Sequence, residues 1–131
     1  MLHFEIITPE KILFSEDVDT FEAPGVEGEF QILEGHTPFL TGLNTGHIIF
    51  AKNGKKTYIS ISGGFCEVKK DKAVILAQTA EKASEIDKTR AEEAKKRAEV
   101  RLKAKDDPSI DEERARLALL RAINRLKLVE M

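Results

Sequence analysis

The pattern of residues changes abruptly across positions 80–91 of this 131-residue chain, and that change constrains the fold more than any other feature. Before it, short segments rich in β-branched residues are separated by glycines. Beyond it there is no glycine, and the sequence consists almost entirely of alanine, leucine, arginine, lysine and glutamate. A switch from two-residue alternation to helical periodicity at one point is typical of a boundary between two domains. We therefore expect a β domain over residues 1–83 and a helical domain over residues 84–131.

Charge is distributed unevenly between these two parts. Residues 81–131 carry 14 of the 21 lysines and arginines and 12 of the 23 acids, which leaves a net charge of about +2 there and −4 in the rest. Positive and negative side chains are interleaved along the helical part. Such a pattern is typical of a solvated helix surface rather than a tract that binds nucleic acid. We therefore expect no nucleic-acid partner.

The composition also limits the covalent and membrane chemistry of the chain. Cys66 is the only cysteine, so neither an internal disulfide nor a zinc site made of several cysteines is expected. No apolar run approaches the ~20 residues that a membrane-spanning helix needs. The first residues carry neither a basic leader nor an arginine-rich transit pattern. We expect a soluble chain.

The first part of the chain is a series of predicted short strands. Leu2, Phe4 and Ile6 alternate with other residues as in a half-buried strand, and Asn53-Gly54 between residues 47–51 and 55–61 is typical of a hairpin turn. Gly63-Gly64 is expected to interrupt a strand. Because no helix separates the strands, no parallel connections are expected. The pattern predicts an antiparallel β-sandwich, or flattened barrel.

Little in this first part indicates chemistry of its own. His3, His36 and His47 are scattered along the sequence, which favours surface or turn positions over a metal site. Gly63-Gly64 is not followed by Lys-Ser or Lys-Thr, so it is no phosphate-binding loop, and a strand bend or tight backbone packing is expected there. No serine lies in a nucleophile-elbow motif. We predict neither a metal site nor catalytic residues.

The second part is predicted to form an antiparallel hairpin of two helices. Ser84-x-x-Asp87 supplies an N-terminal cap pattern with Asp87 in the first turn, and Asp106-Asp107-Pro108 is expected to open the second helix. Small and apolar residues recur at spacings of three and four along each helix: Ala91, Ala94, Ala98 and Leu102, then Ala115, Ala118, Leu119, Ala122, Ile123 and Leu126. Facing rows of alanine allow close approach but bury little apolar area. A weakly packed element attached to a stable one is a candidate for a conformational switch, and the alternative is a static hairpin.

Several motifs in order along the chain carry a family resemblance. They are Pro24-Gly25-x-x-Gly28-Glu29-Phe30-x-Ile32-Leu33-x-Gly35-His36-x-Pro38-x-Leu40, then Ser62-Gly63-Gly64-Phe65 followed by Glu67-Val68, then Ile86-Asp87-x-x-Arg90-Ala91, and finally Arg121-Ala122-x-Asn124-Arg125-Leu126. Each is weak alone, but the ordered set covers nearly the whole chain. The chain resembles the epsilon subunit of the F-type ATP synthase, of bacterial or plastid type.

The resemblance implies a place in the central stalk. The β-sandwich would contact the gamma subunit and the membrane-embedded ring of c subunits, with Glu29 and His36 in the region that faces that ring. The alternative to an interface role is that the glycines of residues 24–40 are needed only for the turns of the backbone. We expect the chain at the cytoplasmic face of the bacterial inner membrane, with which it would associate only through the complex. The stromal face of the plastid thylakoid is the alternative.

The resemblance also implies roles for the arginines. By this resemblance, the ATP site of certain bacterial epsilon subunits corresponds to a set of residues around the start of the first helix and on the second: Glu81, Ile86, Asp87, Arg90, Ala91, Arg97, Arg121 and Arg125. Arg90 and Arg97, and likewise Arg121 and Arg125, share a helix face, so the four would converge if the helices fold back. The alternative is that these arginines are solvated and pair with Glu92, Glu93 and Glu113. When the hairpin extends, Arg114, Arg116, Arg121 and Arg125 would contact the alpha and beta catalytic subunits and hinder ATP hydrolysis.

We therefore expect a rotor subunit that regulates an ATP synthase and has no catalysis of its own. No cofactor is required, and ATP is expected as a regulatory ligand. The competing interpretation is a free-standing ATP-binding sensor that acts through another partner. Co-purification with gamma distinguishes the two.

Overall fold

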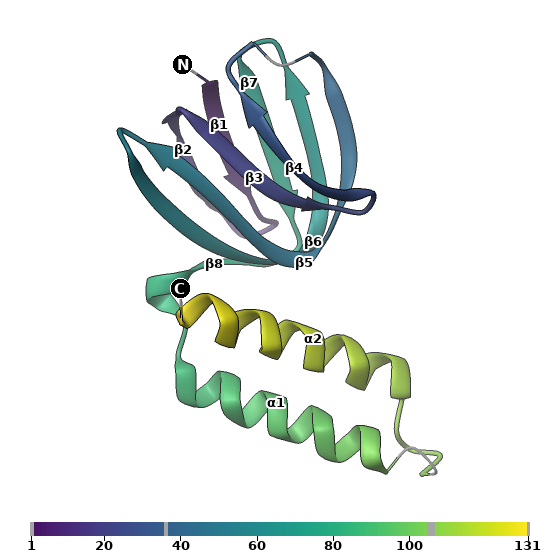
Figure 1. Cartoon of the computed structure of the whole chain (residues 1–131). Coiled ribbons are helices and arrows are strands. Elements are labelled where there is room, and N and C mark those ends of the chain that lie inside the picture. The colour runs from purple at the N-terminus through teal and green to yellow at the C-terminus, as the bar shows by residue number, and fades with distance from the viewer. Residues whose placement is uncertain (1, 36, 105–106, 131) are drawn as a thin grey trace. The chain divides into compact units, whose positions relative to one another are not determined.

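The computed structural model describes residues 2–35, 37–104 and 107–130. The chain divides into two compact units, Met1–Ala83 and Ser84–Met131, the first made of strands and the second of two helices (Figure 1). The last strand, β8, spans Ala80–Lys82, and the first α-helix begins at Lys88. The predicted change from strand to helix across residues 80–91 is confirmed.

Eight strands are found within the described residues, and seven of them form one hydrogen-bonded path in the order β2-β1-β7-β6-β5-β3-β4, with β8 paired to β6. The strands are β1 (Leu2–Ile7), β2 (Ile12–Val18), β3 (Thr20–Gly25), β4 (Gly28–Leu33), β5 (Phe39–Lys52), β6 (Lys55–Lys69), β7 (Lys72–Ala77) and β8 (Ala80–Lys82). A short 3₁₀ turn, Ala83–Glu85, follows them.

The core of the first unit is built from alternate residues of these strands. In β1, Leu2, Phe4 and Ile6 are buried, whereas the residues between them are half-exposed. The ring of Phe4 stacks on that of Phe21 from β3, with ring centroids 4.4 Å apart. Phe50 from β5 packs against the same cluster. Seventeen such buried residues form one continuous core, and the predicted β-sandwich is confirmed.

One pairing departs from the expected all-antiparallel arrangement. β1 pairs with β7 in parallel, with Glu5 opposite Val74 and Ile7 opposite Leu76. The expectation that no strands would pair in parallel was therefore wrong. It rested on the lack of a crossover helix, but here β2–β6 make the long connection between the two strands, so no helix is required.

The Asn53-Gly54 turn is confirmed, and the strands on either side of it are longer than predicted. Asn53 and Gly54 have φ angles of 53° and 79°, the left-handed pair that a type I′ turn requires. β5 and β6 then pair from Lys52–Lys55 back to Phe39–Val68. On either side of this long hairpin, β3 pairs with β5, and β7 pairs with the second half of β6.

Gly63 and Gly64 do not interrupt the strand, contrary to the expectation from sequence. β6 runs through both, and Gly64 pairs with Leu43 on one side and Ala77 on the other. Gly64 has a φ of 149°, and a Cβ built there would overlap the carbonyl oxygen of Leu76. The glycine therefore allows two backbones to approach where a side chain would separate them.

The second unit contains α1 (Lys88–Lys103) and α2 (Glu112–Val129), which run antiparallel (Figure 1). Asp87 is the N-cap of α1: its carboxylate accepts a hydrogen bond from the backbone N–H of Arg90 at 3.1 Å. The prediction that Ser84 would cap this helix was wrong, because Ser84 lies in the preceding 3₁₀ turn. Neither helix is long and apolar enough to span a membrane, as far as the described residues show.

The second helix begins later than predicted. Asp111, rather than Asp106 or Asp107, caps α2, and its carboxylate accepts from the N–H of Arg114 at 3.1 Å. Asp107 instead accepts hydrogen bonds from the backbone N–H and hydroxyl of Ser109, which lower the pKa of its carboxyl. Asp106 lies outside the described residues. Asp107 and Pro108 thus form the connection between the helices, because a local turn competes for the capping aspartate.

Alanines form the contact between the two helices. Ala91 and Ala98 of α1 and Ala115 and Ala122 of α2 are almost completely buried. Each methyl group removes little apolar area from water compared with a leucine. The predicted alanine contact is confirmed. That this contact stabilises the hairpin only weakly stays a prediction.

Candidate functional site

The Ile86-Asp87-x-x-Arg90-Ala91 motif spans the start of α1, and its residues have different roles. Asp87 is the helix cap, so its carboxylate is engaged with the backbone of Arg90. Ala91 is buried in the contact between the helices. Ile86 is half-buried, whereas Asp87 and Arg90 are exposed, and Arg90 is the only one of the four named residues with a positive charge. Of this motif, Arg90 is the residue with a group available to bind an anion.

Arg90, Arg97 and Arg121 each immediately precede an alanine that is buried between the helices: Ala91, Ala98 and Ala122. One residue is a rotation of about 100° on an α-helix, so each arginine lies on the same flank of its helix relative to that contact. Arg125 is one turn beyond Arg121 and shares its flank. Because the helices are antiparallel, equivalent flanks of the two meet on one side of the hairpin. The structure thus brings these four arginines to one face.

Ion pairing does not occupy most of these arginines. In the helical unit, Arg116 is bound to Glu112 at 3.1 Å and to Glu113 at 2.9 Å. Across the described part of the chain, Arg90, Arg97 and Arg121 form no ion pair with an acidic side chain, and all three are exposed. Glu113 is thus paired with Arg116, and not with one of the four arginines proposed for the nucleotide site.

Arg114 and Arg116 lie on different flanks of α2. Arg114 precedes the buried Ala115 and therefore shares the flank of Arg121 and Arg125. Arg116 is two residues further on and lies on the opposite flank, held by its two glutamates. Glu81, predicted with the nucleotide residues, belongs to β8 of the first unit and is half-buried.

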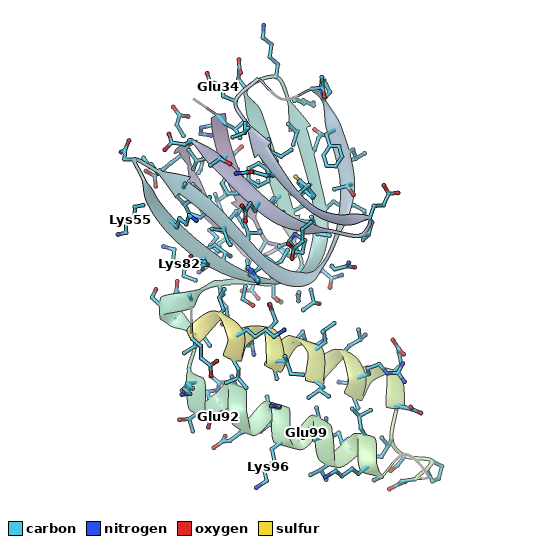
Figure 2. All side chains as sticks on the ribbon, in the orientation of Figure 1. Glu34, Lys55, Lys82, Glu92, Lys96 and Glu99 are labelled. Atoms are coloured by element: carbon cyan, nitrogen blue, oxygen red, sulfur yellow. The ribbon has the colours of Figure 1, made fainter. Side chains whose placement is uncertain are left out.

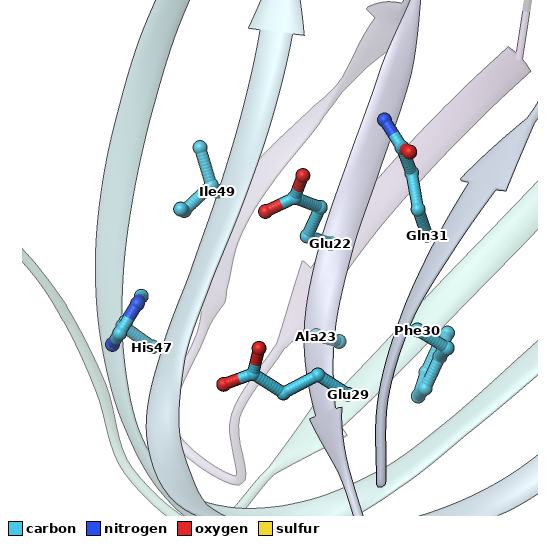
Figure 3. A pocket seen from close by; sticks show the side chains of 7 residues that line it. All are labelled: Glu22, Ala23, Glu29, Phe30, Gln31, His47 and Ile49. Atoms are coloured by element: carbon cyan, nitrogen blue, oxygen red, sulfur yellow. The ribbon is translucent and has the colours of Figure 1, made fainter.

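The other predicted contact residues lie on the β-sandwich. Glu29 is an exposed residue of β4, and His36 lies outside the described residues. Glu22, Glu29 and His47 are among the residues that line a hollow of about 240 Å³. Figure 3 shows the carboxylate of Glu29 on the side of His47 and that of Glu22 nearer to Ile49. Within the described chain no three His, Cys, Asp or Glu side chains gather to hold a metal ion. Burial raises the pKa of the Cys66 thiol to about 12, which keeps it protonated.

A row of exposed apolar residues crosses the sheet and was missed in the sequence. Phe65 of β6 lies opposite Leu76 of β7, which lies opposite Ile7 of β1, which lies opposite Ile12 of β2. Phe65, Leu76 and Ile12 are 60%, 52% and 61% exposed, and Ile7 is half-exposed. We call these four residues the apolar row. The available signal was β7, where Val74 and Leu76 are apolar on the face opposite the core.

Comparisons with known proteins identify relatives over the full chain. The family model "ATP synthase, Delta/Epsilon chain, beta-sandwich domain" matches residues 1–83, and "ATP synthase, Delta/Epsilon chain, long alpha-helix domain" matches residues 84–130. The ATP synthase epsilon chain of Nitratidesulfovibrio vulgaris is 47% identical over 127 residues, covering 97% of this chain and 94% of the relative. That of Desulforamulus reducens is 48% identical over 126 residues, covering 96% and 95%.

A solved structure shares the fold. A chain in the cryo-EM structure of the Euglena gracilis mitochondrial ATP synthase (OSCP/F1/c-ring, rotational state 1) superposes with a TM-score of 0.86. The two chains are 22% identical, and the match covers 99% of this chain and 81% of the other. The same succession of sandwich and paired helices therefore occurs in a distant sequence.

Proposed function

This chain belongs to the delta/epsilon chain family of the ATP synthase, and from that premise we propose that it is a non-catalytic rotor subunit of a proton-translocating enzyme. Its sandwich would attach to the gamma subunit and the c ring in the central stalk, with Glu29 and His36 towards the ring. The complex would place it at the cytoplasmic face of a bacterial inner membrane. Its helices would restrain ATP hydrolysis by the alpha and beta subunits.

The apolar row is the observation that supports attachment to the stalk. Four apolar side chains in register across four adjacent strands form a continuous exposed strip, whereas exposed apolar residues on a soluble protein are usually scattered. The adjacent Glu5 and Lys72 form an ion pair of 3.2 Å, so the strip is flanked by neutralised charges. A strip of this kind suits a partner with an apolar surface. We assign it to gamma because the family resemblance places the sandwich against that subunit.

Replacing Phe65 and Leu76 by serine is expected to weaken binding to gamma about a hundredfold. Each side chain exposes more than half its surface, and loss of its burial against a partner costs about 1–2 kcal/mol. Binding is measured by titration with purified gamma and by co-purification. The matched control is Leu120→Ser, which removes an exposed apolar side chain from α2.

Equal binding by the double variant and the control would refute docking through the apolar row. A wild-type chain that does not bind gamma at all would instead favour the free-standing ATP sensor. Because neither Phe65 nor Leu76 belongs to the buried core, both variants should keep the melting temperature of the wild type.

The hairpin supplies the proposed regulation. Its alanine contact is weak, so extension of the helices has a small cost compared with unpacking a leucine-rich core. Extension would carry Arg114, Arg116, Arg121 and Arg125 to acidic segments of the catalytic subunits. ATP bound by Arg90, Arg97, Arg121 and Arg125 would favour the folded-back state, because the four arginines share one face only in that state.

Replacing Arg114, Arg116, Arg121 and Arg125 by alanine is expected to raise ATP hydrolysis by the assembled enzyme severalfold without loss of assembly. The reason is that the electrostatic attraction of the extended helices for the catalytic subunits is removed. Arg116→Ala alone should have a smaller effect, since Arg116 must first leave Glu112 and Glu113. If the wild-type chain inhibits hydrolysis and the variant with all four substitutions inhibits it equally, inhibition does not depend on the charge of these arginines.

A further inference from the structure

Two arginines outside the nucleotide set extend the same face of the hairpin. Arg101 is one turn beyond Arg97 on α1, and Arg114 is two turns before Arg121 on α2. The two helices therefore carry the same spacing: Arg90, Arg97 and Arg101 on α1, and Arg114, Arg121 and Arg125 on α2. We call these six residues the arginine face.

The two rows of the arginine face run in opposite directions because the helices are antiparallel. Arg90 lies at the open end of the hairpin with Arg125, and Arg101 lies near the connection with Arg114. At a rise of 1.5 Å per residue, the rows extend about 16 Å along the helices. The phosphates of one nucleoside triphosphate cover only part of that length, so the face is longer than the proposed nucleotide site needs.

Ion pairing and helix stability do not explain Arg101 and Arg114, the two arginines outside the nucleotide set. Arg97 and Arg101 line an open hollow of about 460 Å³ together with Glu93, Lys96 and Val100, of which Lys96 is labelled in Figure 2. Among the described residues, neither Arg101 nor Arg114 forms an ion pair, and both are exposed. Arg114 lies in the first turn of α2, where the helix dipole favours anionic side chains and opposes a cation.

The surroundings of the arginine face indicate a thin ligand of high charge density. Between the arginine rows lie Ala94 and Ala118, which are half-buried and small. Val100, which is 59% exposed, lines the same hollow as Arg97 and Arg101. Neither helix contains an aromatic side chain, however, and aromatic anchors are typical of protein interfaces. Arginine forks bind phosphate oxygens in pairs and keep their charge at all physiological pH values.

We propose that the arginine face binds a linear chain of condensed phosphate, that is, inorganic polyphosphate, along its whole length. The ligand bridges both helices and therefore stabilises the folded-back hairpin. It shares Arg90, Arg97, Arg121 and Arg125 with the proposed nucleotide site and competes with ATP for them. Binding to the isolated chain does not depend on the role of the chain in the rotor.

The experiment compares tripolyphosphate with a linear polyphosphate long enough to span the face, by calorimetry on the full chain at several salt concentrations. Long polyphosphate should bind more than tenfold tighter than tripolyphosphate. In Arg101→Gln/Arg114→Gln, its affinity should fall at least tenfold, and the slope of log K against log salt should decrease by about 2, one for each arginine. Tripolyphosphate, which can still bind at the open end, should change by no more than about threefold.

Lys103→Gln/Lys127→Gln is the matched control, since it removes one cation from each helix on the other flank. It should keep long-chain affinity within about twofold. The proposal is overturned if the two double variants behave alike, if long polyphosphate binds no tighter than tripolyphosphate, or if a glutamate-rich peptide of equal charge binds tighter than polyphosphate. Circular dichroism verifies that helix content is kept. Polyphosphate binding without ATP binding would support this inference and refute the nucleotide part of the proposed function.

Discussion

Replacing Gly64 with alanine is expected to lower the free energy of unfolding of the β-sandwich by about 3 kcal/mol or more, which is a large effect for one methyl group. The added Cβ would overlap the carbonyl oxygen of Leu76 and lie 2.9 Å from the Cα of Ala77. Both are backbone atoms of β7, so no side-chain rotation relieves the overlap. The φ of 149° adds strain of roughly 1–3 kcal/mol for a residue with a side chain.

Thermal and urea unfolding measure this effect. For a domain of this size, 3 kcal/mol corresponds to a fall in Tm of more than about 10 °C. Gly54→Ala is the control, because Gly54 also has a positive φ of 79° but has open space around its Cβ position. It should cost only about 1–2 kcal/mol. Equal losses in the two variants would show that backbone strain, and not the approach of β6 to β7, sets the requirement for glycine.

Replacing Arg90 with alanine is expected to weaken ATP binding to the isolated chain by roughly ten- to a hundredfold, because one charge-assisted contact contributes about 1.5–3 kcal/mol. Arg90 is exposed, forms no ion pair within the described chain, and belongs to the motif at the start of α1. Its side chain does not take part in the alanine contact of the helices. Calorimetric titration of ATP into wild type and variant, side by side, measures the loss.

Two further variants separate binding from helix stability. Asp87→Asn keeps the N-cap, since asparagine caps as well as aspartate, so unchanged ATP affinity would identify Asp87 as a structural residue. Lys127→Ala removes a cation near the same end of the hairpin but on the other flank, and should leave ATP affinity unchanged. No heat with wild type at millimolar ATP would refute the nucleotide site, and equal affinity in Arg90→Ala would place it elsewhere.

Local patterns were sufficient to predict much of the fold. The alternation in β1, the Asn53-Gly54 turn and the alanine spacing of the helices each involve residues close together in sequence, and all three were found in the structure. Helix starts were harder. Asp107 and Asp111 lie within one turn of each other, and the choice between them depended on Ser109, which binds Asp107 in a competing turn.

By itself, the sequence determined that strands precede helices and that the β5–β6 hairpin turns at Asn53-Gly54. It also determined the fixed spacing of alanines and arginines along the helices. Each of these features depends on neighbours within a few residues. Only the tertiary structure decided the parallel pairing of β1 with β7, which backbone atoms approach Gly64, and the continuity of the apolar row. Each of these joins strands far apart in the chain, where register is set by the packing of a common core and not by local preference. The same reason applies to the arginine face, since its two rows meet on one side only because the helices pack antiparallel through their alanines.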